Sequence, residues 1–406
     1  MENRLLHTPE GVRDIYGDEM LKKRFLMEKL ESLVSSFGFR EIETPTFEYF
    51  DVFNREIGTT PSKEVYKFFD SENNTLALRP DLTPGVARAA VKYFMEEGLP
   101  IRLYYLGHSF SNRSGLQGKL KEVTELGVEY MGEASVYADA EIVDLAVELL
   151  KMAGLKEFQI CIGTAEYYKG LCAAAGLKRD AERMLSHHIR NKNLFGTAEL
   201  IKEMGLDSRI GDALSSLPML FGEVDILDKA LGLIEGIDRP VAAIERLKKL
   251  YEILKIYGIE DYVTFDLGLL SRHQYYSGMV LRAYTFGTGE AIIRGGRYDH
   301  LLESFGKAGP AVGFTVVIDQ LMNILTRQSI PIDMQLNRVL LCFEEEYFAK
   351  ALTEASKLRS SGAQVEMMKI DRGMDPYAIR KHAIEVNAEK LLRLTGDGLE
   401  TQLLTQ

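Results

Sequence analysis

The order of strand-like and helix-like segments is the strongest constraint on the fold of this chain. Three strand-like runs come first, at 101–110, 127–132 and 158–163. Three more come later, at 262–268, 275–286 and 290–297. Between the two groups, residues 165 to about 260 hold several helix-like stretches and no convincing strand. A sheet interrupted by a helical insertion indicates an α+β fold, because a doubly wound fold alternates strands and helices regularly.

The connections between strands predict a mainly antiparallel sheet. The last two strands are joined around Gly287 and Gly289, which favours a hairpin. Helices that flank the sheet are predicted over 18–37, 138–152 and 313–326. Gly38 is well placed to end the first of these helices. We therefore expect helices packed against an antiparallel sheet.

The C-terminal part of the chain has a different pattern. After a short linker at 329–337, strand-like and helix-like runs alternate, which is typical of a small α/β unit. We therefore expect a core over 1–328, which includes the helical insertion over about 165–260, and a separate small α/β domain over 338–406.

Composition limits the classes of site that the chain can carry. The cysteines Cys161, Cys172 and Cys342 are far apart and form no CxxC pair, so neither a disulfide framework nor a zinc site is indicated. No run approaches the roughly 18 apolar residues of a membrane helix, and the first residues lack the apolar core of a signal peptide. The net charge of −11 argues against a main role in holding a polyanion. We expect a cytoplasmic protein without a metal, a cofactor or a membrane contact.

Three acidic residues fall where they could hold a cationic ligand. Asp81 precedes a predicted helix start with Thr83 as N-cap and Pro84 in the first turn, where backbone N–H groups converge. Asp81 and Thr83 are therefore either capping residues or ligand contacts. Glu125 and Glu129 lie four residues apart, so on a strand both point to one face and could hold an ammonium group. The alternative for this pair is a solvated face of the sheet.

Two later segments could complete a ligand pocket. Tyr275 and Tyr276 either form the wall of a pocket or divide between core and surface. In the segment 295–299 (GGRYD), the glycines either let the backbone approach a ligand or close a hairpin. This segment is no dinucleotide-binding fingerprint, because its glycines fall between predicted strands and do not open a helix.

Taken in order, these segments resemble histidyl-tRNA synthetase, a class II aminoacyl-tRNA synthetase, over nearly the whole chain. The matching segments are 9–15 (PEGVRDI), 37–45 (FGFREIETP), 78–83 (LRPDLT), 126–129 (LGVE), 275–278 (YYSG), 295–299 (GGRYD) and 310–314 (PAVGF). They match the family's opening, motif 1, the Leu-Arg-Pro-Glu-Gly-Thr loop, the strand after motif 2, two histidine-pocket segments and the start of motif 3. The resemblance implies a class II synthetase-like antiparallel sheet, with a truncated anticodon-binding-like domain at the C-terminus.

The resemblance also implies a pocket for the amino acid histidine. In the synthetases the acidic and threonine positions of the loop, the strand acid and the tyrosines bind this ligand. The positions carried over to this sequence are Asp81, Thr83, Glu125, Glu129, Tyr275 and Tyr276. Two of them depart from the family pattern, because Asp81 is one methylene shorter than the family's glutamate and Glu125 stands where the synthetases have glutamine.

Three further departures remove the cations on which adenylation depends. Ser111 stands where motif 2 has the arginine that grips the ATP α-phosphate and the histidine carboxylate. Gln320 replaces the motif 3 arginine for the triphosphate, and Ser271 replaces the arginine of the histidine-specific segment. Arg113 and Arg272 stand nearby, but side chains shifted along a strand project differently. Losing one such donor typically costs about 10²- to 10³-fold in rate, so we expect a chain that binds histidine without activating it.

This pattern is similar to that of the regulatory subunits of ATP phosphoribosyltransferase, a family of synthetase paralogues. The similarity implies a non-catalytic subunit that activates a short catalytic subunit in the first step of histidine biosynthesis, responds to histidine and forms a homodimer through its motif 1-like region. Residues 338–406 carry 10 Lys plus Arg and 11 Asp plus Glu, a net charge of −1, so we expect no tRNA binding. Two alternatives remain: an active histidyl-tRNA synthetase, and a paralogue that serves another partner such as a kinase or an RNA.

Overall fold

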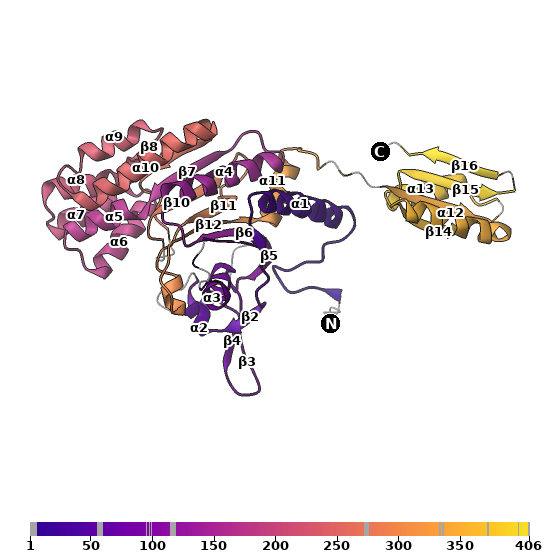
Figure 1. Ribbon diagram of the computed structural model, residues 1–406, viewed down its shortest axis with the longest axis horizontal. Helices are drawn as coiled ribbons and strands as arrows, with labels where there is room; N and C mark the ends of the chain where they lie inside the picture. The colour runs from indigo at the N-terminus through magenta and orange to yellow at the C-terminus, as the bar shows by residue number, and fades with distance from the viewer. Residues whose placement is uncertain are drawn as a thin grey trace. The chain divides into compact units, whose positions relative to one another are not determined.

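The computed structural model divides the chain into two compact units (Figure 1). They comprise 1–332 and 333–406, and each has a hydrophobic core of its own. The residues that the structure describes are 6–54, 60–94, 96, 98, 100–113, 119–271, 276–332, 334, 337–371, 373–396 and 398–404.

A nine-stranded sheet forms the centre of the first unit. From one edge to the other its strands are β1 (Arg40–Glu41), β5 (Ile101–Phe110), β6 (Glu122–Met131), β12 (Ala311–Val317), β11 (Ile293–Arg297), β10 (Met279–Tyr284), β7 (Gln159–Thr164), β9 (Val263–Asp266) and β8 (Phe221–Gly222). Neighbours are antiparallel except at β1–β5 and β7–β9. The predicted antiparallel sheet and the hairpin of β10 and β11 are therefore confirmed.

The two faces of the sheet pack against different helices, because side chains alternate along each strand. On β5, Tyr104 belongs to the core formed with α1 (Gly17–Ser36) and α4 (Val136–Met152), whereas Tyr105 belongs to a separate core formed with α3 (Thr83–Tyr93). Figure 1 shows α3 and α1 on opposite sides of β5 and β6. The α3 side carries the candidate ligand residues.

A second, three-stranded antiparallel sheet precedes α3 in the chain. Its strands, in spatial order, are β2 (Phe47–Tyr49), β4 (Thr75–Leu78) and β3 (Lys67–Phe69), with the short helix α2 (Asp51–Asn54) after β2. This sheet was not predicted, because runs of three or four residues are too short for alternation to show. Since β4 ends three residues before Asp81, the sheet fixes where the acidic loop begins.

Helices fill the segment between β7 and β9. They are α5 (Ala165–Ala174), α6 (Arg179–Arg190), α7 (Leu194–Met204), α8 (Ser208–Ser216), α9 (Asp225–Gly232) and α10 (Asp238–Tyr257). Helices α5 and α10 pack so closely that a Cβ added at Gly170 would lie 2.7 Å from Pro240 Cδ. The two-residue strand β8 also lies in this segment and pairs with β9, so the insertion extends the sheet by one strand.

One predicted helix is wrong. Residues 313–326 do not form a single helix, because β12 runs to Val317 and α11 (Ile318–Arg327) begins only after it. Most of β12 is buried, and a continuous apolar run of this kind cannot be told from a buried helix by its periodicity.

Two smaller expectations also differ from the structure. Gly295 and Gly296 lie inside β11, hydrogen-bonded between β10 and β12, and not in a turn. Thr83 is the first helical residue of α3 and not its N-cap, since Leu82 holds that position. The side chain that accepts a hydrogen bond there is Asp81, whose Oδ1 lies 2.9 Å from Thr83 N.

The second unit is a small α/β domain. Its sheet has the order β14 (Gln364–Lys369), β13 (Arg338–Phe343), β15 (Lys390–Thr395) and β16 (Gly398–Leu403). Helices α12 (Phe348–Ser360) and α13 (Pro376–Glu385) pack into separate cores, one on each face of this sheet. The strand β16 was not predicted, because it is mostly exposed and shows no alternation of buried side chains.

A buried ion pair ties the first helix of the core unit to the sheet. Lys23 Nζ on α1 lies 2.6 Å from Asp319 Oδ1 on α11 and 2.6 Å from Thr124 Oγ1 on β6. Asp319 Oδ2 also accepts the N–H of Thr124 at 2.6 Å. Both charged side chains are almost fully buried, so removal of either one leaves the other without compensation.

We expect the substitution Lys23→Met to lower the free energy of unfolding by about 3 kcal/mol, because it leaves the Asp319 carboxylate buried without a cation. Urea unfolding followed by circular dichroism measures this change. Lys255→Met is the control, since the pair of Lys255 with Glu252 is exposed, and it should leave the free energy of unfolding unchanged within error. Similar losses in both variants would contradict the assigned role of the buried pair.

Candidate functional site

Two glutamates on β6 point to the same face of the sheet, as their spacing predicts. Leu126 and Val128, which alternate with them, pack in the core on the other face. Glu129 is only 2% exposed, whereas Glu125 remains partly accessible. The pair therefore lies on the inner side of the sheet, facing α3 and the loop that leads into it.

Asp81 brings a third carboxylate to these two. Burial and the nearby charge of Asp81 raise the pKa of Glu125 to about 7. Burial raises the pKa of Glu129 to about 8, with a smaller contribution from Asp81, although hydrogen bonds from Tyr298 and Thr83 oppose the shift. The charge of Asp81 thus disfavours the ionisation of both glutamates, whereas the charges of Arg294 and Arg79 oppose the rise in the pKa of Glu125.

Glycines make room for this cluster. A Cβ added at Gly313 on β12 would lie 2.2 Å from Glu129 Oε2, and one at Gly127 would lie 2.3 Å from the hydroxyl of Tyr105. Both positions are register partners across the sheet, Gly313 of Glu129 and Gly127 of Tyr105. No other residue fits where these side chains lie flat against the neighbouring strand, so the glycines shape the floor of the pocket.

Hydroxyl groups surround the carboxylates. The Tyr298 hydroxyl donates to Glu129 Oε2, and Ser109 Oγ donates to Glu125 Oε1 at 2.8 Å. The Tyr105 hydroxyl lies 2.9 Å from Thr315 Oγ1 and 3.4 Å from Thr83 Oγ1. Thr83 therefore reaches the site from the first turn of α3, and the predicted residues Asp81, Thr83, Glu125 and Glu129 lie together.

Tyr276 lies at the edge of the same apolar core as Tyr105 and Tyr298. It is buried, and a Cβ added at Gly296 would lie 2.8 Å from its ring, so its position depends on that glycine. Lys169 Nζ on α5 donates to the Tyr276 carbonyl at 2.7 Å, which links the helical insertion to this segment. The predicted Tyr275 lies outside the described residues.

Two arginines lie near the site, and the charges of Arg294 and Arg79 oppose the rise in the pKa of Glu125. Arg79 Nε donates to His108 O at 2.6 Å and Nη1 donates to Thr44 O at 2.7 Å. Arg294 Nη2 lies 3.7 Å from Glu290 Oε2. Among the residues that the structure describes, no lysine or arginine forms an ion pair with any of the three carboxylates of the site.

Three further positions were singled out by the resemblance, namely Ser111, Ser271 and Gln320. Ser111 follows β5 directly, and its Oγ is buried without a hydrogen-bond partner within the described chain. Gln320 lies in the first turn of α11, with Nε2 at 3.4 Å from Glu290 O. Ser271 lies in the loop after β9. Arg113, two residues after Ser111, pairs with Glu64 at 2.7 Å.

A buried ion-pair network connects the pocket with the insertion. Arg297, which precedes Tyr298, lies 2.6 Å from Asp139 Oδ1 on α4. Arg246 on α10 lies 2.5 Å from the other oxygen of Asp139. Asp139 therefore bridges the end of β11, next to the pocket tyrosine, and a helix of the insertion.

The hydroxyl partners of the acids are what sequence reasoning missed. Tyr105 and Ser109 lie four residues apart on β5, so both point to the same face of the sheet. Because β5 pairs with β6, the alternation of side chains along β5 was the signal that could have found them. Tyr298 lies in the segment 295–299 that was singled out for its glycines, but its hydroxyl received no role. Thr315 could not be found, because its segment was predicted as helix.

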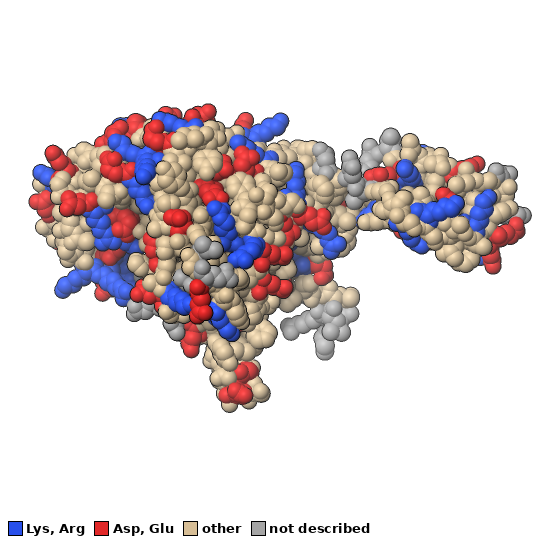
Figure 2. Space-filling model, viewed as in Figure 1, with Lys and Arg blue, Asp and Glu red and all other residues tan. Residues whose placement is uncertain are grey.

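Surface charge is mixed on the face of the molecule in Figure 2, where acidic and basic side chains are interspersed. Within the described ranges, no group of three His, Cys, Asp or Glu residues is arranged to hold a metal ion. None of the described helices has both the length and the apolar character that a membrane crossing requires.

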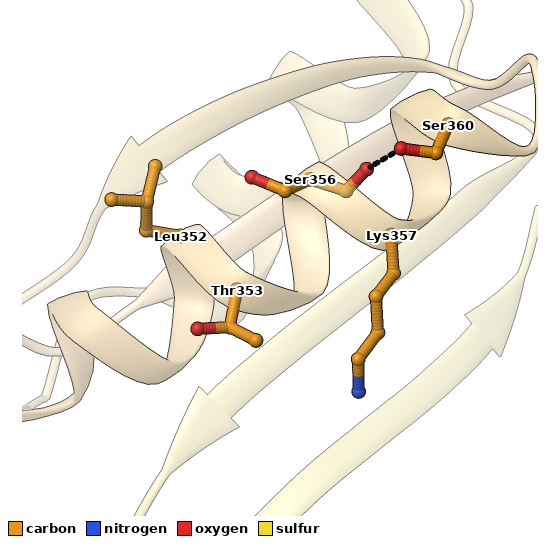
Figure 3. A pocket seen from close by; sticks show the side chains of 5 residues that line it. All are labelled: Leu352, Thr353, Ser356, Lys357 and Ser360. Atoms are coloured by element: carbon orange, nitrogen blue, oxygen red, sulfur yellow. Dashed lines mark hydrogen bonds between the residues drawn. The ribbon is translucent and has the colours of Figure 1, made fainter.

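A shallow pocket lies along α12 in the second unit (Figure 3). It is lined by Leu352, Thr353, Ser356, Lys357 and Ser360. Two of its hydroxyls are bonded to their own helix, Thr353 to Ala349 O at 3.0 Å and Ser360 to Ser356 O at 2.9 Å. The outer side of one helix with satisfied hydroxyls assembles no chemistry, so the acidic pocket of the first unit is the candidate site.

Comparison with known proteins places this chain in a family. The family model described as "Histidyl-tRNA synthetase" matches residues 11–321. A curated relative from Acetivibrio thermocellus, named "ATP phosphoribosyltransferase regulatory subunit", is 36% identical over 89% of this chain and 86% of its own. A relative of the same name from Ruminiclostridium cellulolyticum is also 36% identical, over 91% of this chain and 88% of its own.

A solved structure agrees with these relatives. The protein from Bacillus halodurans, described as "ATP phosphoribosyltransferase regulatory subunit/histidyl-tRNA synthetase", is 29% identical and superimposes with a TM-score of 0.84. The match covers 96% of this chain and 98% of that protein's chain. The shared fold and the matched relatives lead to one conclusion: this chain belongs to the histidyl-tRNA synthetase family, within the group of its members named ATP phosphoribosyltransferase regulatory subunits.

Proposed function

We propose that this chain is a non-catalytic regulatory subunit of ATP phosphoribosyltransferase, which acts with a short catalytic subunit in the first step of histidine biosynthesis. The proposal rests on one contrast. The acidic pocket is hydrogen-bonded within the fold, whereas positions 111 and 320 hold the neutral side chains of Ser111 and Gln320 and not a cation. Transfer of an adenylyl group requires cations where negative charge develops, so this site is equipped for binding and not for adenylation. The names of the relatives support the same function.

Histidine is the proposed effector. Its ammonium group would be held by Asp81, Glu125 and the hydroxyl of Thr83, and its ring by Glu129 and the tyrosines, including Tyr275 and Tyr276. If histidine binds one arrangement of the complex more tightly than another, it shifts the complex towards that arrangement. Reciprocity then requires that the state of the complex change the affinity for histidine.

The proposed assembly is a homodimer, formed through the region of α1 and β1, that binds the catalytic subunit in the cytoplasm. The unit of residues 338–406 is proposed to be a reduced form of the anticodon-binding domain. Its four-stranded sheet and its charge balance of 10 basic and 11 acidic residues support a role other than tRNA binding.

The decisive measurement is the ATP phosphoribosyltransferase activity of the short catalytic subunit from the same organism, with and without this chain. We expect activity to appear or rise strongly only in the mixture, and to fall as histidine is added. No change on mixing would overturn the proposal. Histidine-dependent exchange of pyrophosphate into ATP by this chain alone would instead establish an active synthetase.

Asp81→Asn should weaken histidine binding by about tenfold or more, because the variant loses a carboxylate but keeps the oxygen that accepts Thr83 N–H. Isothermal titration calorimetry on the purified chain measures the affinity. Asp225→Asn, at an exposed pair with Lys229 on α9, is the control and should bind histidine like the unmodified chain. If Asp81→Asn binds histidine normally, the effector site lies elsewhere, for example at the interface with the catalytic subunit.

Glu129→Gln should change the pH dependence of stability. The pKa of Glu129 is about 8 in the folded chain and about 4.5 when exposed, so between these values the folded chain holds a proton that the unfolded chain has released. Stability therefore falls as pH rises through this range, and the glutamine variant, which does not titrate, escapes that loss. We expect the variant to gain at least about 1 kcal/mol relative to the unmodified chain between pH 5 and pH 8.5.

Urea unfolding at the two pH values measures the gain. Glu122→Gln is the matched control, because Glu122 lies on the same strand with the opposite parity and so faces away from the cluster. An equal response of the two variants to pH would show that Glu129 is ionised in the folded chain.

A further inference from the structure

We propose that Asp139 joins the helical insertion to the acidic pocket, so that the contact of Arg246 with Asp139 controls how tightly the pocket holds its ligand. This coupling rests on the proposed function, because it concerns the regulation of the same pocket. Asp139 and Arg246 are positioning residues, which act on the ligand through Arg297 and Tyr298.

The carboxylate of Asp139 is shared by two arginines from different parts of the fold. Asp139 lies in the first turn of α4 and is 1% exposed. Arg297, at the end of β11, donates to its Oδ1 from Nε at 2.7 Å, and Nη2 lies 2.6 Å from the same oxygen. Arg246, on α10 of the insertion, donates to Oδ2 from Nε at 2.9 Å and from Nη2 at 2.5 Å. Each oxygen is therefore bound by two nitrogens of one guanidinium group.

The same two arginines hold the loop between β6 and α4. Arg297 Nη1 donates to Glu133 O at 3.0 Å, and Arg246 Nη2 donates to Ala134 O at 2.9 Å. This loop follows the strand that carries the pocket acids Glu125 and Glu129. The insertion thus contributes one of the donors that fix the exit of that strand.

Arg297 also connects directly to the pocket. Its carbonyl accepts the N–H of Ser277 at 2.8 Å, and Ser277 follows the buried Tyr276. The next residue, Tyr298, donates its hydroxyl to Glu129 Oε2. A shift of Arg297 therefore displaces the segments of two pocket tyrosines at once.

The two arginines differ in how easily they can leave Asp139. The side chain of Arg297 is 4% exposed, so its departure would leave two buried charges unpaired. The side chain of Arg246 is 36% exposed and can withdraw into water while Arg297 still compensates the buried carboxylate. Bound and withdrawn Arg246 are thus two arrangements of one contact, and coupling between distant sites requires such an element.

A ligand that contacts Glu129 and Tyr298 would bias this contact. It would fix the segment that contains Arg297 and Tyr298, and with it the position of the Asp139 carboxylate that receives Arg246. The ligand then favours the bound arrangement of Arg246. By reciprocity, bound Arg246 raises the affinity of the pocket for the ligand.

Arg246→Gln tests the coupling. Calorimetric titration of the full chain with L-histidine should give a dissociation constant about fivefold higher or more in the variant. Arg239→Gln is the matched control on the same helix, because Arg239 pairs with Glu166 on α5, which also belongs to the insertion. It should bind L-histidine like the unmodified chain. Equal affinities of Arg246→Gln and Arg239→Gln would overturn the proposal.

Amide hydrogen exchange separates coupling from a purely structural role of Arg246. Saturating L-histidine should slow exchange in α10 of the unmodified chain and of Arg239→Gln, because the ligand holds Arg246 in place. The same ligand should have no effect on α10 in Arg246→Gln. The proposal is wrong if the ligand slows exchange in α10 equally in Arg246→Gln, or leaves α10 of the unmodified chain unchanged at saturation.

A second variant tests the coupling without a ligand. Tyr298→Phe removes the hydroxyl that donates to Glu129, and should speed exchange in α10 but not in α1. Tyr377→Phe, at an exposed tyrosine of the second unit, should change neither helix. An α10 that does not respond to Tyr298→Phe contradicts the coupling.

The outcome is separable from that of the proposed function, because activation of the catalytic subunit is measured without histidine. If activation fails while α10 responds to Tyr298→Phe, the proposed function is wrong and the coupling stands. If activation succeeds while α10 is unchanged and Arg246→Gln binds histidine normally, the coupling is wrong and the regulatory function stands.

Discussion

The burial of carboxylates on β6 is the constraint on which the pocket depends. An ionised carboxylate without a partner is costly away from water, so the surroundings must supply hydrogen bonds or a proton. The fold supplies hydroxyls from β5 and from the segment after β11, and the raised pKa of Glu129, about 8, shows that the compensation is incomplete. This arrangement requires glycine at positions 127 and 313, because a side chain at either position would collide with Tyr105 or Glu129 where it lies flat against the neighbouring strand.

The same cluster gives the pocket a physical connection to the helical insertion. Tyr298 donates to Glu129, its neighbour Arg297 pairs with Asp139, and Asp139 pairs with Arg246 on α10. A change at the acids can therefore reach the insertion through side chains in direct contact. Such contiguity is a route for coupling and becomes allostery only if the network has two arrangements that ligand and partner populate differently.

The strands and helices that could be predicted are those whose length, side-chain alternation and bounding turn residues can all be read within one continuous segment. The strand at 101–110 was placed to the residue, since its length and turn residues define it. The segment 313–326 was not, because β12 is buried on both faces and then runs directly into α11. For the pocket, the acids follow from spacing and resemblance, whereas Tyr105 and Thr315 enter through cross-strand register, which a single sequence does not display.

Catalysis and binding could separate in this fold because they depend on different parts of the sheet. Glu125 and Glu129 lie within β6, where each side chain is fixed by the pairing on both sides. Ser111, Ser271 and Gln320 lie after β5, after β9 and in the first turn of α11, where a changed side chain leaves the register intact. Arginines at these places can therefore be lost without disturbing the pocket floor.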